Sequence, residues 1–254
     1  MRSETVQSAT INNNLTRTHC DTMNRNHFTG FILVLIVLAG CLGNRSHLAA
    51  SDPSESDTSW APQKYGEKMM DPSKANETAP ETFKVKFETT KGDFVVQVNR
   101  KWSPNGADRF YNLVKIGYFD DVVFFRCIEG FMNQFGIHGD PIINDAWADA
   151  TIKDDPRVKG VSNQKGYLTF ARTGAPNSRS VQFFINAGDN ARLDTMGFTP
   201  IGKIVQGMDN FLKLNTQYGE NQPQDQEQFQ KKGNDYILGK YPKLDRILHA
   251  TLVE

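Results

Sequence analysis

The spacing of hydrophobic and polar residues becomes regular at Thr82. Apolar residues alternate with charged ones over residues 83–88, and the alternation returns over residues 94–98 after a Lys-Gly-Asp turn. A period of two residues is typical of a half-buried β-strand, and a short polar turn joins two such strands into a hairpin. The pattern therefore predicts a folded domain over residues 82–254 that begins with a β-hairpin.

A helical period follows this hairpin. Ser103 suits a helix N-cap and Pro104 suits the first helical position, and the apolar residues that follow are spaced three and four positions apart until Gly117. A second helix is expected over residues 208–217. Residues 219–243 are polar, rich in Gln and irregular, and we expect them to form a long surface loop.

Short apolar runs, separated by glycines and polar clusters, predict the remaining strands. These strands are expected at residues 122–128, 131–134, 167–171, 181–186, 198–205 and 247–253. Many short strands with only two helices favour a closed barrel, because closure removes exposed strand edges. The predicted fold class is therefore mainly β: a closed, antiparallel, eight-stranded β-barrel capped by two α-helices.

One uninterrupted apolar run precedes the predicted domain. It covers residues 31–39 and ends at Gly40-Cys41, so it is shorter than the stretch of about 20 apolar residues that a membrane-spanning helix needs. Its length is that of the hydrophobic region of a signal peptide. The sequence Leu-Ala-Gly-Cys at its end resembles the lipobox of bacterial lipoproteins. This resemblance implies that Cys41 is lipidated and that its acyl chains anchor the protein to a membrane.

Other interpretations of the N-terminal segment stay open. An ordinary signal peptide cleaved near Ala50 fits the same run, and so does an uncleaved anchor or a chain that is not exported. A start at Met23 gives a signal peptide of more usual length than a start at the first residue. We expect residues 1–41 to form the signal and lipobox region. Residues 42–81, rich in Ser, Asp, Glu, Pro and Thr, are expected to form a flexible linker.

Composition narrows the chemistry that the domain performs. The 254 residues include 29 Lys and Arg and 29 Asp and Glu, and this net charge of zero argues against a general nucleic-acid binder. The three cysteines form no CxxC pair and the five histidines are scattered, so we expect no bound metal. The sequence contains no GxSxG elbow, no P-loop and no dinucleotide-binding fingerprint. We therefore expect neither an activated nucleophile nor a cofactor.

Two segments carry chemistry that plain barrel strands do not need. The first is residues 124–136 (FFRCIEGFMNQFG), and the second combines residues 168–172 (LTFAR) with residues 180–186 (SVQFFIN). Together they offer an Arg in a hydrophobic strand, two Gln residues, a Phe-Met pair and a second Phe pair. A pocket of these side chains suits an apolar, uncharged ligand that is rich in carbonyl groups. A proline-containing peptide is such a ligand.

These segments are similar to the cyclophilin type of peptidyl-prolyl cis/trans isomerase. The run F-x-R-x-I-x-G-F-M-x-Q-x-G resembles the cyclophilin signature, and S-V-Q-F-F-I resembles that family's G-S-Q-F-F-I strand. The resemblance extends over about residues 82–254 and includes Leu193-Asp194 and the segment 198–203. It implies an isomerase of bacterial, exported type that accelerates rotation about X-Pro peptide bonds without a covalent intermediate.

The resemblance also implies roles for individual residues. Arg126 matches the catalytic arginine, which donates to the prolyl nitrogen when the peptide bond is twisted. Gln134 and Gln182 match polar groups that hold the substrate backbone and position the arginine, and Gln134 is counted with Arg126 as catalytic. Ala171 and Arg172 match the strand against which the peptide backbone pairs. The walls of the proline pocket are matched by Phe131, Met132, Phe184, Leu193 and Phe198.

Three positions depart from the family pattern. Arg192 stands where the family often has a Trp that favours cyclosporin binding, so sensitivity to this cyclic peptide is in doubt. Phe198 aligns with the pocket histidine, which keeps the wall apolar but removes a polar tip. Arg172 replaces an Asn and adds a second positive charge near the site, which favours acidic or carbonyl-rich clients. Ligand preference, and not reaction type, is the part that these departures leave open.

The leading hypothesis is a monomeric enzyme that acts on proline-containing polypeptide clients. We expect it on the periplasmic side of a membrane, anchored through Cys41. A second hypothesis is a binding or chaperone module that holds proline-containing segments with little catalysis, and a third is a structural lipoprotein. The intact Arg126, Gln134 and Gln182 favour the enzyme, because a pure binder needs no arginine aimed at the prolyl nitrogen.

Overall fold

The computed structural model describes residues 64–219 and 226–254. The predictions for the signal and lipobox region, including lipidation of Cys41, lie outside these residues. Within the described part of the chain, no helix has the length and apolar character needed to cross a membrane.

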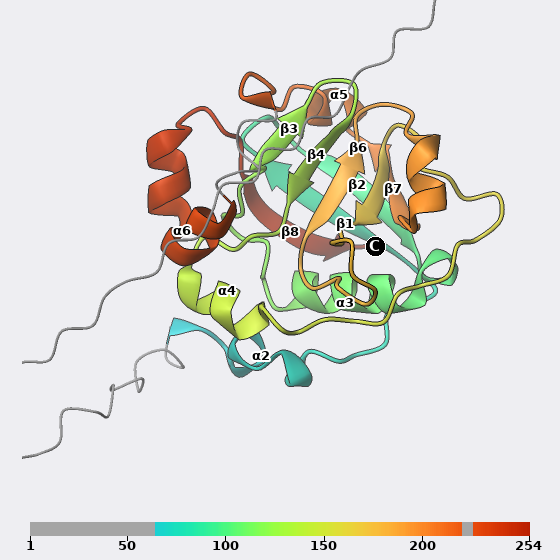
Figure 1. Cartoon of the computed structure of the whole chain (residues 1–254), viewed down its shortest axis with the longest axis horizontal. Coiled ribbons are helices and arrows are strands. Elements are labelled where there is room, and N and C mark those ends of the chain that lie inside the picture. The colour runs from blue at the N-terminus through green and yellow to red at the C-terminus, as the bar shows by residue number, and fades with distance from the viewer. Residues whose placement is uncertain (1–63, 220–225) are drawn as a thin grey trace, which may run out of the picture. The chain divides into compact units, whose positions relative to one another are not determined.

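Eight antiparallel strands form one curled sheet in the described residues (Figure 1). The strands are β1 (Thr82–Thr89), β2 (Phe94–Asn99), β3 (Arg126–Ile128), β4 (Met132–Phe135), β5 (Tyr167–Phe170), β6 (Phe183–Asn186), β7 (Pro200–Gln206) and β8 (Ile247–Val253). Their order in the sheet is β3-β4-β6-β5-β7-β2-β1-β8. The mainly β fold and the positions of the strands are thus confirmed to within a few residues.

The expectation of a closed barrel is wrong, because no ladder joins the two edge strands β3 and β8 in the described residues. They are linked just ahead of their first residues by an isolated bridge between Val123 and Arg246. There, Phe124 N donates to Asp245 O at 2.9 Å. The physical reason for the gap is that β3 contains only 3 residues and cannot run along the whole of β8. The architecture is an eight-stranded half-barrel.

The first hairpin follows the predicted alternation. In β1 the side chains of Val85 and Phe87 face the core, and in β2 those of Phe94 and Val96 do so. The register pairs Val85 with Val96 and Phe87 with Phe94, whose rings stack at 4.9 Å between centroids. The alternation predicts these strands correctly because one face of the hairpin is buried. A shift of the strand register by one residue would expose every apolar side chain.

The helices differ more from expectation. The first predicted helix is confirmed as α3 (Pro104–Lys115), but the second is only the short α5 (Met208–Phe211). The chain does not continue as a helix to residue 217. Instead, the backbone N–H of Asn215 donates to the Asp245 carboxylate at 2.7 Å. The remaining helical elements are α2 (Glu67–Met70), α4 (Pro141–Trp147), α6 (Gln226–Lys240) and the 3-10 turns η1 (Pro72–Lys74), η2 (Arg100–Trp102) and η3 (Ala191–Met196). A cap of only two helices is therefore a wrong prediction.

Helix α6 occupies the segment that was expected to be a surface loop. Its buried residues Phe229 and Ile237 pack with Phe125 and Ile137 in a second hydrophobic core. The rings of Phe125 and Phe229 lie 6.1 Å apart. Figure 1 shows α6 beside α4, and the two helices are in contact.

The linker prediction is wrong for residues 64–81, which pack against the domain. Met69, Ala75 and Ala79 are buried in the main core. The indole Nε1 of Trp147 donates to the carbonyl oxygen of Met69 at 2.8 Å, which fixes α2 beneath α4. These contacts join residues about 80 positions apart, so the local composition of the segment carries no sign of them.

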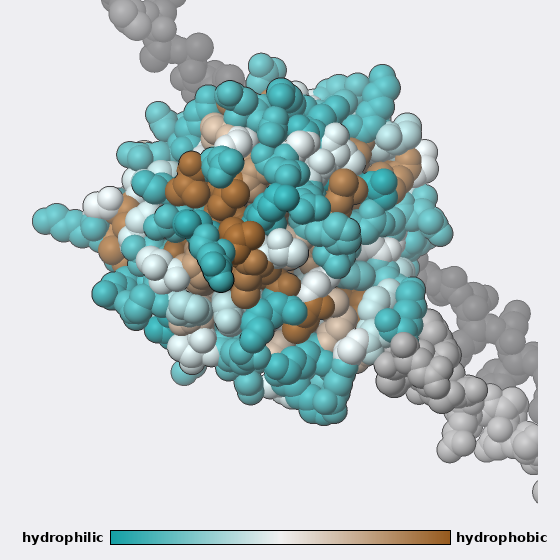
Figure 2. Space-filling model, turned by 180° about the vertical axis from the view of Figure 1, so that it is seen from behind, coloured by the Kyte–Doolittle hydropathy of each residue, from teal (hydrophilic) through white to brown (hydrophobic). Residues whose placement is uncertain are grey.

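The surface of the domain is mostly hydrophilic. Figure 2 shows hydrophobic residues gathered in a band on the face turned away from the view of Figure 1. Six large hydrophobic side chains are exposed in the described residues: Met196, Val205, Leu212, Leu248, Leu252 and Val253. A small number of such side chains is usual for a folded domain.

Candidate active site

A third hydrophobic cluster, separate from the two cores, forms an apolar pocket. Its buried members are Met132 on β4, Phe184 on β6 and Leu193 in η3. Ile128, Phe131, Ala171 and Phe198 pack against them. The rings of Phe184 and Phe198 meet edge to face at 5.8 Å between centroids. The structure thus brings together the residues expected to form the walls of a proline pocket.

Arg126 lies beside this pocket. Strand alternation directs its neighbour Phe125 into the second core, and Arg126 itself lines the pocket. The guanidinium carbon of Arg126 is 5.9 Å from the ring centroid of Phe131. Its Nη1 donates to Oε1 of Gln134 at 3.4 Å, and the register pairs these two residues across β3 and β4.

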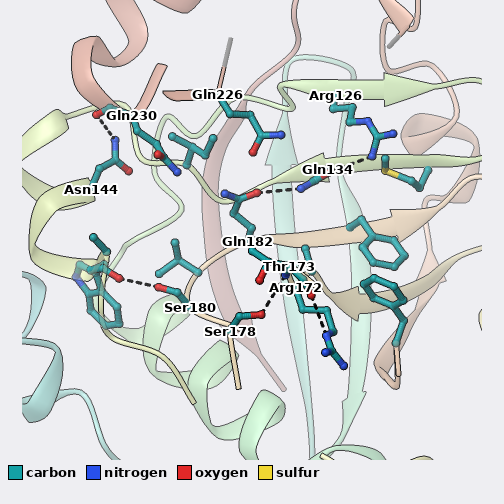
Figure 3. Close-up of a pocket in the computed structure, with 18 of the residues that line it drawn as sticks. Arg126, Gln134, Asn144, Arg172, Thr173, Ser178, Ser180, Gln182, Gln226 and Gln230 are labelled. Atoms are coloured by element: carbon teal, nitrogen blue, oxygen red, sulfur yellow. Dashed lines mark hydrogen bonds between the residues drawn. The ribbon is translucent and has the colours of Figure 1, made fainter. Parts of the chain in front are cut away.

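The polar contacts continue from Gln134 to Gln182. Nε2 of Gln134 donates to Oε1 of Gln182 at 2.9 Å, as Figure 3 shows. Gly136 makes this approach possible, because its φ is +114° and a Cβ there would lie 2.2 Å from the carbonyl oxygen of Val181. Arg126, Gln134 and Gln182 therefore form one hydrogen-bonded row along the side of the pocket.

A buried polar network holds the pocket wall that η3 provides. The Asp194 carboxylate accepts from Ser162 Oγ at 2.5 Å and from the backbone and side-chain nitrogens of Asn163 at 2.9 and 2.7 Å. Asn163 Nδ2 also donates to the carbonyl oxygen of Phe198 at 2.7 Å. Burial opposes ionisation of Asp194, but the hydrogen bonds from Ser162 and Asn163 outweigh it and lower the pKa of that carboxyl. Leu193 and Phe198 are thereby fixed against Phe184.

The two arginines that depart from the family pattern behave differently. Arg172 directs its guanidinium into its own loop, where it donates to the carbonyl oxygen of Thr173 at 3.1 Å (Figure 3). It also donates to the carbonyl oxygen of Ala175 at 3.1 Å. Its Nη1 lies 3.6 Å from the Asp154 carboxylate, so its charge is paired there. The exposed Arg192 instead covers the ring of Phe131, with 4.8 Å between its guanidinium carbon and the ring centroid.

The pocket continues past Gln182 into a second compartment that the sequence did not reveal. The whole groove has a volume of about 650 Å³. Its far end is lined by α4, by the segment that leads into β6, and by Gln226 and Gln230 of α6. In Figure 3, Gln182 stands between the two ends. One pattern in the sequence could have revealed the helix that lines this compartment. Within a polar, Gln-rich segment, Phe229, Gly233, Ile237 and Tyr241 follow one another at every fourth position.

The cysteine next to Arg126 does not line the groove. Cys127 is buried, and burial raises the pKa of its thiol, so it behaves as a small hydrophobic side chain. Over residues 64–219 and 226–254, no group of three His, Cys, Asp or Glu side chains is placed to hold a metal ion.

Comparison with known proteins places these features in a family. The family model described as cyclophilin type peptidyl-prolyl cis-trans isomerase/CLD matches residues 84–235. Peptidyl-prolyl cis-trans isomerase B of Escherichia coli is 33% identical over 137 residues, which are 51% of this chain and 82% of that protein. A peptidyl-prolyl cis-trans isomerase of Acinetobacter baylyi is 33% identical over 134 residues, covering 51% of this chain and 70% of that one.

Solved structures give a weaker match. A crystal structure of a cyclophilin type peptidyl-prolyl cis-trans isomerase from Cryptosporidium parvum has 20% sequence identity and a TM-score of 0.49. The alignment covers 68% of this chain and 98% of that chain. The family model and the curated relatives decide the assignment: the chain belongs to the cyclophilin-type peptidyl-prolyl cis-trans isomerase family, which is a family of enzymes.

Proposed function

We propose that the domain isomerises X-Pro peptide bonds without covalent chemistry and that Arg126 stabilises the twisted amide. The observation that carries this proposal is the place of the Arg126 guanidinium, beside the apolar pocket and hydrogen-bonded to Gln134. The prolyl ring occupies the pocket of Met132, Phe184 and Leu193. The prolyl nitrogen then faces Arg126.

The barrier to this reaction is electronic. The peptide C–N bond has partial double-bond character, and rotation about it costs about 18–20 kcal/mol. Half-way through the rotation conjugation is lost, and the prolyl nitrogen gains a lone pair that accepts a hydrogen bond. A guanidinium donates to this nitrogen only in the twisted state, so Arg126 lowers the barrier without stabilising either ground state.

The contributions can be divided by magnitude. An acceleration of about 10⁵ requires the barrier to fall by about 7 kcal/mol. One hydrogen bond from a charged donor contributes about 1.5–3 kcal/mol, and more in a preorganised site that excludes water. The remainder is assigned to the pocket, which holds the ring while the preceding carbonyl swings, and to Gln134 and Gln182, which hold Arg126 and the client backbone in place.

The test separates catalysis from mere binding. The cis-to-trans relaxation of a short Ala-Pro peptide is followed with and without the protein, and binding of the same peptide is measured by calorimetry. We expect relaxation to accelerate in proportion to enzyme concentration. A protein that binds the peptide and leaves its relaxation rate unchanged is the binding or chaperone module that stands as the alternative.

We further propose that the clients are exported proteins and that the enzyme is anchored to the membrane through a lipid on Cys41. The lipobox-like sequence ahead of Cys41 supports this proposal. The enzyme is also proposed to act as a monomer. Mass spectrometry of the mature N-terminus tests the anchor: a diacylated Cys41 is expected, and an unmodified Cys41 within a longer peptide would contradict it.

A further inference from the structure

A buried arginine lies behind the pocket and does not line the groove itself. Arg179 is only 3% exposed, and arginine is rarely buried to this extent unless it is paired. Its Nη1 donates to the Asp154 carboxylate, and its Nη2 donates to the carbonyl oxygen of Gly197. The carbonyl oxygen of Arg179 accepts from the backbone N–H of Ile152 at 2.9 Å. The guanidinium therefore joins the loop at Asp154 to the end of η3.

The hydrogen bond to Gly197 holds the peptide group that precedes Phe198. Gly197 ends η3 with a φ of +82°, a conformation that favours glycine. On the other side of Phe198, its own carbonyl oxygen accepts from Nδ2 of Asn163 at 2.7 Å. Phe198 is thus held through the peptide groups before and after it. Its ring meets that of Phe184 at 5.8 Å between centroids.

Asp154 sets the orientation of the Arg179 guanidinium. The Asp154 carboxylate also accepts from the backbone N–H of Asn177 at 3.0 Å, and Oδ1 of Asn177 accepts from the backbone N–H of Asp154 at 2.9 Å. Arg172 approaches the same carboxylate at 3.6 Å, but it donates to carbonyl oxygens of its own loop. Of these two arginines, Arg179 is the one that donates to the backbone next to the pocket wall.

Phe198 is the pocket wall that depends most on such support. Met132 and Phe184 stand within β4 and β6, whereas Phe198 lies in the connection between η3 and β7. No sheet ladder fixes Phe198, so its position is set by the hydrogen bonds to the peptide groups around it. In a hydrophobic pocket whose walls do not yield, one additional methylene changes kcat/KM by about 10–200-fold. The rigidity of Phe198 therefore bears on the size of the ring that the pocket accepts.

We propose that Arg179 is a positioning residue that makes the pocket selective for the five-membered ring of proline. The inference rests on the proposed function, in which this ring occupies the pocket. Arg179 acts through Gly197 and Phe198 and touches neither the client nor the reacting atoms. Without its guanidinium the Phe198 corner yields, and a ring with one more methylene is accommodated. Arg126 and its partners keep their places, so the chemistry itself is preserved.

The experiment uses the full-length protein and two peptides: a blocked Ala-Pro peptide, and the same peptide with pipecolic acid, whose ring has six members, in place of proline. We expect the wild-type kcat/KM to be at least about tenfold higher for the proline peptide, and Arg179→Ala to lower this ratio to about threefold or less. Arg100→Ala is the matched control, because Arg100 pairs with Asp108 through two hydrogen bonds and does not line the groove. It is expected to keep the wild-type ratio.

A second variant covers the case in which Arg179→Ala does not fold. Asp154→Asn keeps the shape of the side chain but removes the charge that orients Arg179, and it is expected to lower the ratio at least about twofold. An unchanged ratio in whichever of these two variants folds would overturn the proposal. So would a fall of kcat/KM by the same factor for both peptides, because that is the effect of a merely structural residue.

Failure of the proposed function looks different, because neither peptide is then isomerised. In that event the ratio of the dissociation constants for the two peptides, measured by calorimetry, decides the role of Arg179. Tighter binding of the proline peptide by the wild type, lost in Arg179→Ala or Asp154→Asn, supports the proposal. Equal binding of both peptides by the wild type, or a preference that both variants keep, contradicts it.

Discussion

Nε2 of Gln134 donates a 2.9 Å hydrogen bond to Oε1 of Gln182, and this contact joins β4 to the segment that leads into β6. On its other side, Gln134 accepts a hydrogen bond from Arg126 at 3.4 Å. The orientation of Gln134 is therefore set from both ends: its oxygen faces the guanidinium and its nitrogen faces Gln182. Gln134 therefore links Arg126, which lies beside the apolar pocket, to Gln182.

Replacing Gln134 by Ala is expected to lower kcat for an Ala-Pro peptide by about tenfold and to change KM by less than threefold. The reason is that the variant removes a partner of Arg126 and leaves the apolar pocket intact, and a lost hydrogen bond of about 1.4 kcal/mol corresponds to a factor of ten. Gln97→Ala, on the outer side of β2, serves as the control. A variant whose KM rises while kcat is unchanged would show that Gln134 holds the client and does not position Arg126.

Arg192→Trp is expected to make the enzyme more sensitive to cyclosporin. Arg192 covers the ring of Phe131 with its guanidinium carbon 4.8 Å from the ring centroid, at the position where the family often has Trp. A Trp there supplies an apolar wall to the cyclic peptide. Inhibition of peptide relaxation by cyclosporin, measured for wild type and variant, checks this. An equal inhibition constant for both proteins would mean that Phe198 or the Arg172 loop limits binding.

Met69→Ala is expected to lower the free energy of unfolding by about 2–4 kcal/mol, which is the usual cost of truncating a buried side chain. Met69 is 7% exposed and lies in the main core, although it precedes the first strand. Met70→Ala is the matched control, because Met70 is only partly buried and should cost less than about 1 kcal/mol. Urea unfolding of the whole chain measures both. Equal, small effects would show that residues 64–81 do not contribute to the core.

Stability is expected to fall as the pH is lowered through about 6.5, the ordinary pKa of histidine. Burial lowers the pKa of His138, whose Nδ1 accepts from the backbone N–H of Asp140 at 2.9 Å. The unfolded chain then binds a proton that the folded domain resists, so the free energy of unfolding decreases with falling pH. Asp194, whose pKa is lowered, adds a separate loss only below about pH 4.

Chemical denaturation at pH 7.5, 6.5 and 5.5 measures this dependence. His138→Gln is expected to flatten the slope between pH 6.5 and 5.5. An unchanged slope in His138→Gln would assign the effect to another group.

The parts of the fold that were predictable are those in which one face of an element is buried. The alternation from Phe83 to Val98 and the helical spacing after Pro104 record contacts with the core directly. The open edge of the half-barrel was not predictable. Whether the sheet closes depends on the length of β3, and the alternation of apolar and polar residues does not give that length. The packing of Met69 under Trp147 was missed for a related reason: the contact spans 78 residues and leaves no local pattern.

The candidate site divides in the same way. Arg126, Gln134, Gln182 and most of the pocket walls lie in two compact motifs, and the structure brings them together with Leu193 and Phe198, which lie outside these motifs. The compartment beyond Gln182 was missed because α6 is mostly polar, and its buried residues Phe229, Gly233 and Ile237 occur only at every fourth position. Asn163 was missed because its partners, Asp194 and Phe198, lie more than 30 residues away. Local patterns identify residues that act within a motif, whereas residues that hold the motif in place are found only in three dimensions.

The most direct test of the account compares two arginines that flank the same ring. The guanidinium carbons of Arg126 and Arg192 lie 5.9 and 4.8 Å from the centroid of Phe131, but only Arg126 is joined to Gln134. The measurement is kcat/KM for relaxation of an Ala-Pro peptide, with peptide binding followed in parallel. Arg126→Ala is expected to lower kcat/KM by about 100-fold with little loss of binding, whereas Arg192→Ala changes it by less than about threefold. An Arg126→Ala enzyme that relaxes the peptide as fast as wild type would contradict the account.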